Sequence, residues 1–165
     1  MFVVLDRDYR TADQVRRVKS RLAAIGVQVH VWRRKELESY LLEPPTMAAA
    51  LAITELDVRS MLDSITLELK DEVSESVANE RARLVKRSDR PATRKRVEAE
   101  VDGIWADPKK RLTLCNPKDV LARVNQQMEA DGRKATSFQR LARTMKPQDV
   151  PDEVKTFLLN VDGQT

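Results

Sequence analysis

Two carboxylates near the start of the chain have the spacing of a metal site. Asp6 and Asp8 follow directly after the apolar, β-branched run at residues 2–5, which predicts a buried strand. Side chains two positions apart lie on the same side of an extended chain, and ligands of open α/β sheets bind outside the carboxyl ends of strands. We therefore expect the two carboxylates to converge on a hard divalent cation, Mg²⁺ or Mn²⁺. The alternative is a polar strand end with solvated acids.

A second pair of carboxylates, Glu36 and Glu38, follows the next predicted strand at residues 27–32. If the strands are parallel neighbours, their carboxyl ends meet at one edge of the sheet. These acids would then join Asp6 and Asp8 in a site for one or two metal ions. Carboxylates this close repel one another unless a cation lies between them. The alternative is a solvent-facing acidic helix start, which the helix dipole also favours.

Lys118 lies in the first turn of a helix that Asn116 and Pro117 are expected to start. The helix dipole disfavours a cation in that turn. We therefore expect this lysine to serve an anionic ligand or transition state, unless it is an exposed and screened side chain. His30 and Cys115 lie on predicted strands without the partners that nucleophilic catalysis needs, and we expect structural roles for both.

A basic run in the middle of the chain could follow a phosphate backbone and give salt-dependent binding. We predict that its residues bind nucleic acid from a helical tip: Arg83, Lys86, Arg87, Arg90, Arg94, Lys95 and Arg96. No aromatic residue is interleaved with them, so base stacking is not expected. The alternative is a solvated hairpin tip without a partner.

The elements that position the carboxylates form a βαβ unit. The capping-box spacing of Thr11 and Gln14 predicts a helix start, and Gly26 is placed where a helix of this kind ends. Strand, helix and strand within roughly 30 residues predict parallel strands with a right-handed crossover. A parallel sheet needs cover on both faces and usually has more than two strands.

The remainder is predicted to be helical with one more strand. We expect a short helix over 36–42 that ends before Pro44 and Pro45, and a third strand at 111–115. The other helices are expected over 47–53, about 55–87, a return helix to Trp105, 116–132, about 137–145 and about 151–161. The fold class is therefore α/β and predominantly helical, with a small parallel sheet.

Composition agrees with this fold class and removes several functions. The 165 residues are 41% hydrophobic, 34% charged and 4% aromatic with four glycines, which argues against both a disordered chain and an all-β barrel or sandwich. One cysteine and one histidine exclude an internal disulfide and cysteine- or histidine-rich metal sites. The single cysteine favours a reducing, cytoplasmic setting, and no membrane span or signal peptide is expected. The net charge of +4 is compatible with a polyanionic partner.

The candidate residues stand in motifs of a known family. The strand that ends in D-x-D at 3–10, VVLDRDYR, and the segment VHVWRRKELESYLLEP at 29–44 resemble the Toprim portion of overcoming-lysogenisation-defect (OLD) family endonucleases. In the second motif Ser39 stands where the family usually has Asn. The resemblance implies a partial, Rossmann-like Toprim core with a long helical insertion.

Two distal segments extend the resemblance over most of the chain. The segment RLTLCNPKDVLARVNQQ at 111–127 is similar to the family's strand followed by a Gly-Lys helix start, with Pro117 in place of the Gly and Lys118 kept. The segment at 137–163 is similar to the family's C-terminal helices. We therefore expect an α/β core at 1–45 and 111–132, a helical arm at 46–110, and C-terminal helices at 133–165.

The resemblance also implies an activity, because the family cleaves DNA phosphodiesters with a divalent metal and is often coupled to an ABC-type ATPase domain. By this resemblance Asp6, Asp8 and Glu38 would belong to the metal site, and Lys118 would stabilise phosphate. Adding the sheet-edge argument, we predict Asp6, Asp8 and Glu36 as ligands of Mg²⁺ or Mn²⁺. We expect Glu38 to complete or orient the site and Lys118 to neutralise developing charge.

The chain also departs from the family. Toprim domains carry an essential glutamate on a strand before the D-x-D strand, and no residues precede that strand here. The sequence also lacks a Walker A motif. Three alternatives remain: a truncated product, a subunit completed by another chain, and a relic used for binding.

The expected function is part of a metal-dependent DNA nuclease that is weakly active or inactive alone. The first rival is a non-catalytic interaction or dimerisation module that docks on an ABC-type ATPase chain or on the missing N-terminal Toprim half, or forms a homodimer. The second rival is a DNA-binding protein that uses residues 81–96.

Overall fold

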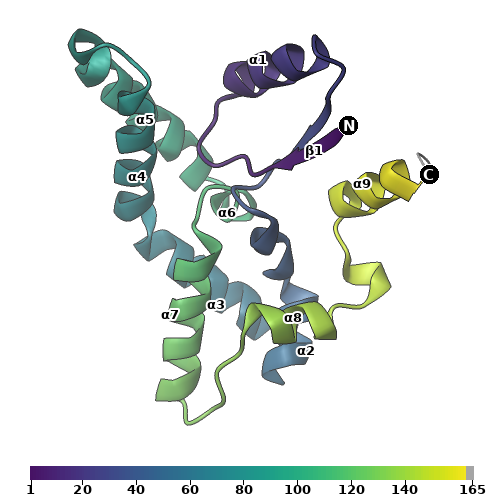
Figure 1. The fold of residues 1–165 in the computed structure, drawn as a ribbon. Helices are drawn as coiled ribbons and strands as arrows, with labels where there is room; N and C mark the ends of the chain where they lie inside the picture. Colours follow the sequence, from purple (N-terminus) through teal and green to yellow (C-terminus); the bar gives the residue numbers. More distant parts are fainter. Residues whose placement is uncertain (163–165) are drawn as a thin grey trace.

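A computed structural model describes residues 1–162, so the last three residues of the predicted C-terminal segment lie outside the described part. The chain is mostly helical, at 68%, with one small parallel sheet of two strands in the described residues. Figure 1 shows the sheet and its helix beside a larger group of helices. The expected class, α/β and predominantly helical, is therefore confirmed.

The βαβ unit forms as predicted. Strands β1 (Phe2–Leu5) and β2 (Gln28–Val31) pair in parallel through the helix α1 (Ala12–Ala23), with Val3 opposite Val29. This pairing brings the carboxyl ends of both strands to one edge of the sheet, where the candidate carboxylates follow.

Local sequence fixes both ends of α1. The Thr11 side chain accepts a hydrogen bond from the Gln14 backbone at 3.2 Å, and the Gln14 side chain accepts one from the Thr11 backbone at 2.8 Å. This reciprocal capping box satisfies two N–H groups that the first turn leaves unpaired. Gly26 then adopts a φ of +73°, the left-handed region, and turns the chain from α1 toward β2.

One face of the sheet is covered by the C-terminal helix α9 (Asp152–Asp162) through aromatic contacts. The Phe157 ring lies 5.8, 4.9 and 5.0 Å from the rings of three even-numbered residues: Phe2, His30 and Trp32. Even-numbered residues share a face because side chains alternate along a strand. Glu153 of α9 adds polar contacts, accepting hydrogen bonds from the Tyr40 hydroxyl and, at 3.0 Å, from the Arg33 backbone.

The two consecutive prolines follow one helix and start the next. The short helix expected over 36–42 forms as a 3₁₀ helix, η1 (Leu37–Leu41), and ends before the prolines as predicted. The next helix, α2 (Pro44–Leu51), starts and ends earlier than the predicted range 47–53, because the prolines occupy its first positions. Proline is tolerated there because the first N–H groups of a helix have no intrahelical partner.

The predicted continuous helix over 55–87 is wrong, because it breaks at Leu69. It forms α3 (Glu55–Glu68) and α4 (Lys70–Arg83), with Leu69 between them at ψ −1° and only 1% exposed. The break lets α3 pack against α2 and α7 while α4 packs against α5. A straight helix could not bury its apolar stripe against both groups.

The return helix forms as predicted and ends at Trp105. After η2 (Arg87–Asp89), α5 runs over Arg90–Trp105 antiparallel to α4 and completes a helical hairpin. The indole N–H of the buried Trp105 donates to the Thr66 carbonyl at 2.9 Å. The far end of α5 is thereby joined to α3.

The third predicted strand, at 111–115, is wrong. The helix α6 (Pro108–Arg111) and a turn occupy this region. The Arg111 side chain is buried, and its guanidinium donates to the Trp105 carbonyl at 2.8 Å and to Asp63 at 2.5 Å. These contacts anchor the segment to α3 and α5, so it does not extend along the sheet.

The C-terminal helices agree with the sequence. The helix α7 (Pro117–Ala130) starts at Asn116, whose side chain accepts a hydrogen bond from the Lys118 backbone at 3.0 Å. The helix α8 (Phe138–Thr144) and a 3₁₀ turn, η3 (Pro147–Asp149), lead to α9. None of the described helices is both long and apolar enough to span a membrane.

The main hydrophobic core lies among the helices. Within residues 1–162, this cluster takes no side chain from β1 or β2. Its largest fully buried members include Leu42, Met47, Val58, Ile65, Leu69, Val97, Val101, Val120, Val124, Met128 and Leu141. The sheet is therefore stabilised by its own contacts with α1 and α9 and by a few links to the helices.

Two glycines provide a matched test of this backbone. We expect Gly26→Ala to lower the free energy of unfolding by about 1–2 kcal/mol, since the added Cβ meets no atom within 4 Å and only the left-handed φ is costly. Gly103→Ala, equally open but inside α5, should raise that free energy by up to about 1 kcal/mol. Urea unfolding followed by circular dichroism measures both, and a shift of the same sign in the two variants would contradict the assignment.

Candidate functional site

The four predicted carboxylates gather at the carboxyl edge of the sheet. Asp6 is an exposed residue, but partial desolvation raises the pKa of its carboxyl, against a hydrogen bond with the Leu37 backbone that lowers it. Three neighbouring carboxylates raise this pKa further: Asp8, Glu36 and Glu38. The structure thus brings together the acids that follow β1 and those that follow β2, and we call these four residues the carboxylate edge.

Backbone contacts between the two post-strand segments hold the carboxylate edge in place. Asp8 has a φ of +49°, and its N–H donates to the Lys35 carbonyl at 3.0 Å. Lys35 N–H in turn donates to the Thr113 carbonyl at 3.1 Å, which joins the same edge to the turn before α7. This chain of hydrogen bonds explains how Lys118, at the start of α7, comes close to the carboxylates.

The acids of this edge are paired with cations of the same chain. Glu36 forms ion pairs with Lys35 and, at 3.7 Å, with Lys118. Asp8 pairs with Arg10 at 2.7 Å. Lys118 therefore has an anionic partner, as its place in the helix suggests, but that partner is a carboxylate of this chain.

Sequence reasoning missed Lys35, which is the most buried lysine at this edge with 8% exposure. Its ammonium lies 5.3 Å from the centre of the Tyr9 ring, a cation–π contact, and next to Glu36. The available signal was a lysine directly before the two glutamates, in a segment predicted to reach the site. Lys35 follows two other basic residues, Arg33 and Arg34, and the sequence does not indicate which of the three is buried.

The edge fits a divalent metal in its chemistry but not in its present arrangement. Carboxylate oxygens are the ligands that Mg²⁺ and Mn²⁺ prefer. Among residues 1–162, however, no three acidic, histidine or cysteine side chains stand close enough to share a metal ion. Glu36 and Asp8 would first have to leave their ion pairs.

Arg81 links the carboxylate edge to the helical hairpin. This buried guanidinium donates to the Tyr9 carbonyl at 3.1 Å, one residue after Asp8. It also binds both oxygens of Glu100 on α5, at 2.5 and 2.9 Å. The hydrogen bonds and charge of Arg81 lower the pKa of Glu100. Arg81 is therefore a positioning residue for the loop that carries Asp8.

His30 and Cys115, for which we expected structural roles, are packed against other side chains. His30 packs between the rings of Trp32, at 4.3 Å, and Phe157, at 4.9 Å. Cys115 is buried, and burial raises its pKa to about 12. A thiol that stays protonated is a poor nucleophile.

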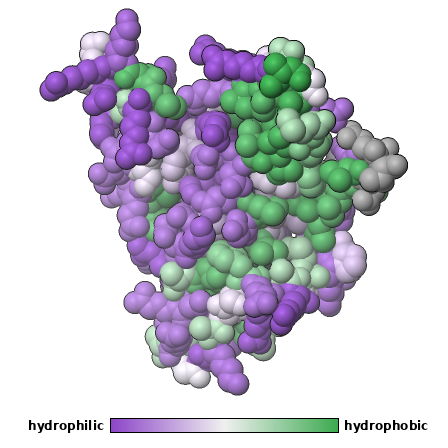
Figure 2. Space-filling view, in the orientation of Figure 1, coloured by the Kyte–Doolittle hydropathy of each residue, from purple (hydrophilic) through white to green (hydrophobic). Residues whose placement is uncertain are grey.

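The predicted nucleic-acid-binding residues lie away from the carboxylate edge, at the tip of the α4–α5 hairpin. All seven are exposed: Arg83, Lys86, Arg87, Arg90, Arg94, Lys95 and Arg96. The same tip projects at the upper left of Figure 2 with hydrophilic side chains outward. The structure therefore separates these seven cations from the carboxylate edge.

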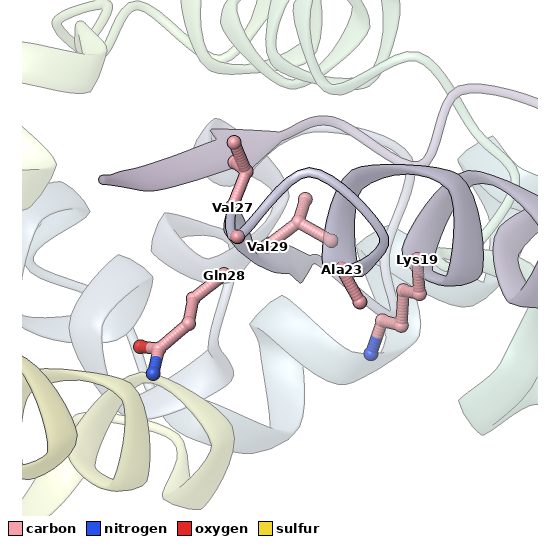
Figure 3. Close-up of a pocket in the computed structure, with 6 residues that line it drawn as sticks. Lys19, Ala23, Val27, Gln28 and Val29 are labelled. Carbon is pink, nitrogen blue, oxygen red and sulfur yellow. The ribbon is translucent and has the colours of Figure 1, made fainter.

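A hollow of about 480 Å³ beside β2 does not belong to either region (Figure 3). It is lined by the side of α1, the turn at Gly26 and the start of β2: Lys19, Ala23, Gly26, Val27, Gln28 and Val29. No carboxylate is among the residues that line it, so this hollow offers no acidic metal site.

Comparisons of the chain with protein-family models, curated proteins and solved structures found no match.

Removing the Arg81 guanidinium tests its positioning role. We expect Arg81→Met to lower the free energy of unfolding by about 2–3 kcal/mol at pH 7, because charged hydrogen bonds to a buried group are lost. Arg83→Met removes an exposed cation whose ion pair with Glu80, at 3.3 Å, is also exposed, and should change this free energy by less than about 0.5 kcal/mol.

The effect should also depend on pH. Because pairing depresses the pKa of Glu100 in the folded state, its contribution is present above the ordinary pKa of 4.5 and is lost as pH falls through the lower folded value. The difference between the Arg81→Met variant and the unchanged protein should therefore shrink below about pH 4.5. Urea unfolding at several pH values measures it, and a difference that grows on acidification would contradict the pairing.

Proposed function

We propose that this chain is part of a Toprim-type, metal-dependent nuclease that hydrolyses DNA phosphodiesters, and that it is weakly active or inactive alone. The observation that carries the proposal is the meeting of Asp6, Asp8, Glu36 and Glu38 at the carboxyl edge of a parallel βαβ unit. Ligand sites of open α/β sheets lie at this edge.

Electrostatics supports a cation site there. Asp6 is repelled by three neighbouring carboxylates, and a divalent cation that binds between them relieves this repulsion. The lysines already present offset only part of this charge at Glu36. An added metal ion would therefore be favoured most beside Asp6, for which no cation pairing is found among the described residues.

The roles within the proposed site follow the sequence expectations. Asp6, Asp8 and Glu36 would hold Mg²⁺ or Mn²⁺, and Glu38 would complete or orient the site. Lys118, 65% exposed in its side chain at the start of α7, would face an anionic phosphate once released from Glu36. The resemblance to OLD-family Toprim domains supplies the reaction class, DNA as substrate and an ABC-type ATPase as the proposed partner.

The ion pairs at the carboxylate edge support the proposal of weak activity. Asp8 is held by Arg10, and Glu36 by Lys35 and Lys118, so metal binding competes with these ion pairs. A further carboxylate from another segment or chain would shift that competition toward the metal. We propose that the complete site is formed in this way.

The same ion pairs favour a second candidate, a non-catalytic interaction module. Asp8 and Glu36 are already paired with Arg10, Lys35 and Lys118, which makes the edge a rigid surface. Such a surface can dock on a partner or on a second copy. Metal binding separates the two candidates, because only the nuclease needs it.

Titration calorimetry with Mn²⁺ tests the site directly. We expect weak, saturable binding that falls by at least about tenfold in Asp6→Asn, because that change removes a charge without changing side-chain shape. Glu129→Gln, an exposed acid on α7, serves as the matched control and should bind as the unchanged protein does. Absence of binding in all three proteins, together with a concentration-dependent oligomer in light scattering, would favour the interaction module.

Nicking of supercoiled plasmid with Mg²⁺ or Mn²⁺ tests completeness. We expect little or no cleavage by this chain, and no measurable cleavage by Asp8→Ala. Robust cleavage that disappears in Asp8→Ala and persists in Glu129→Gln would show that the chain forms a working site unaided, contrary to the weak activity proposed above.

A further inference from the structure

We infer that the tip of the α4–α5 hairpin binds the phosphate backbone of duplex nucleic acid, at a surface separate from the carboxylate edge. We call this surface the basic tip and define it by its exposed cations: Arg83, Lys86, Arg87, Arg90, Arg94, Lys95 and Arg96. The inference stands whether or not the carboxylate edge cleaves a phosphodiester.

The positive charge of the chain is concentrated at the basic tip. Residues 83–96 contain seven cations and one carboxylate, Asp89, which gives a net charge of +6 against +4 for the whole chain. The remaining residues are therefore slightly acidic in total. A polyanion would be attracted to this tip and not to the protein in general.

Most of these cations have no ion-pair partner among residues 1–162. In the described part, Lys86, Arg87, Arg90 and Lys95 form no ion pair. The two engaged members have exposed partners, since Arg83 pairs with Glu80 at 3.3 Å and Arg94 donates to the Asn79 side chain at 2.6 Å. Phosphate oxygens could take the free donors without breaking a buried contact.

Two of the cations lie where the helix backbone is itself positive. Arg90 is in the first turn of α5 and Arg87 lies just before it in η2, with Asp89 at the N-cap as the one carboxylate between them. Each cation near a helix N-terminus costs about 0.3–1 kcal/mol, and an anionic partner would offset that cost. Five of the seven cations are arginines, whose planar guanidinium binds phosphate through two hydrogen bonds.

The hairpin presents these side chains on a rigid support. Thr93, Val97 and Val101 are buried along the inner face of α5, so the neighbouring basic residues point outward. The bidentate pair of Arg81 and Glu100 fastens the two helices just below the tip. A rigid array of charges loses little conformational entropy on binding.

The partner that fits best is a duplex and not a membrane or a single strand. Residues 83–96 contain no aromatic side chain for base stacking or for the membrane interface. Leu84 is their one strongly exposed large hydrophobic residue in the described structure, at 63%, which is too little apolar surface to anchor the tip in lipid. Contacts to the phosphates alone predict binding without sequence preference.

Fluorescence anisotropy with a labelled DNA duplex tests the inference, in EDTA so that metal-dependent cleavage cannot contribute. We expect Arg87→Gln/Arg90→Gln/Lys95→Gln to weaken binding by about tenfold or more, and to reduce the slope of log affinity against log salt by about 2–3. The matched control Arg133→Gln/Lys134→Gln/Arg140→Gln removes the same charge from exposed positions near α8 and should change affinity by less than about twofold.

Three results would overturn the inference. One is equal weakening in both triple variants, which would indicate attraction to net charge only. Another is unchanged binding in the tip variant. The third is tip-dependent binding to vesicles with 30% phosphatidylserine but not to the duplex. Thermal unfolding of both variants establishes that they are folded, and Asp8→Ala should bind the duplex like the unchanged protein, which separates this result from the proposed nuclease.

Discussion

The guanidinium of Arg81 joins the two parts of this molecule. It reaches from α4 to the Tyr9 carbonyl in the loop after β1 and to Glu100 on α5. A two-stranded sheet is at best marginally stable by itself, and the main hydrophobic core takes nothing from either strand among the described residues. The position of the loop that carries Asp8 therefore depends on a few directed contacts, of which this one is the most buried.

Three sets of charged residues in this molecule differ in how far their charges are paired. At one end the carboxylate edge is held by Lys35, Lys118 and Arg10. In the middle Arg81 and Glu100 form a partly buried pair, and at the other end the basic tip is largely unpaired. The buried Lys35 and Arg81 each have a carboxylate partner, whereas most cations of the basic tip have none among residues 1–162. The basic tip can therefore bind an anionic partner with its unpaired cations, whereas the carboxylate edge would first have to give up its ion pairs.

The sequence predicted the parts of the fold that depend on local chemistry. The capping box at Thr11, the start of α7 at Asn116 and the parallel βαβ unit all formed as expected, because short-range spacing determines them. It failed where a distant contact decided the outcome. Arg111 anchors to Asp63 and so prevents a third strand, and the burial of Leu69 from two sides breaks a helix whose apolar stripe seemed continuous.

The candidate site shows the same division. Strand order alone was enough to predict that the acids after β1 and β2 would meet, since parallel strands end at one edge. Which cation would sit beside each acid could not be predicted, because it depends on loop backbones such as the left-handed Asp8. Arg81 was hidden for a related reason: in sequence it looks like the exposed arginines that follow it, and only packing distinguishes it.

The two tryptophans divide between the two parts of the fold, and this gives the protein a built-in pair of optical reporters. Trp32 lies in the aromatic cluster over the sheet, beside the imidazole of His30. Trp105 is buried among the helices, and its indole N–H donates a hydrogen bond to the Thr66 carbonyl. Replacing one at a time leaves a single fluorophore in a known part. Coincident unfolding curves would mean one cooperative unit, whereas separate curves would mean that the sheet opens while the helices stay folded.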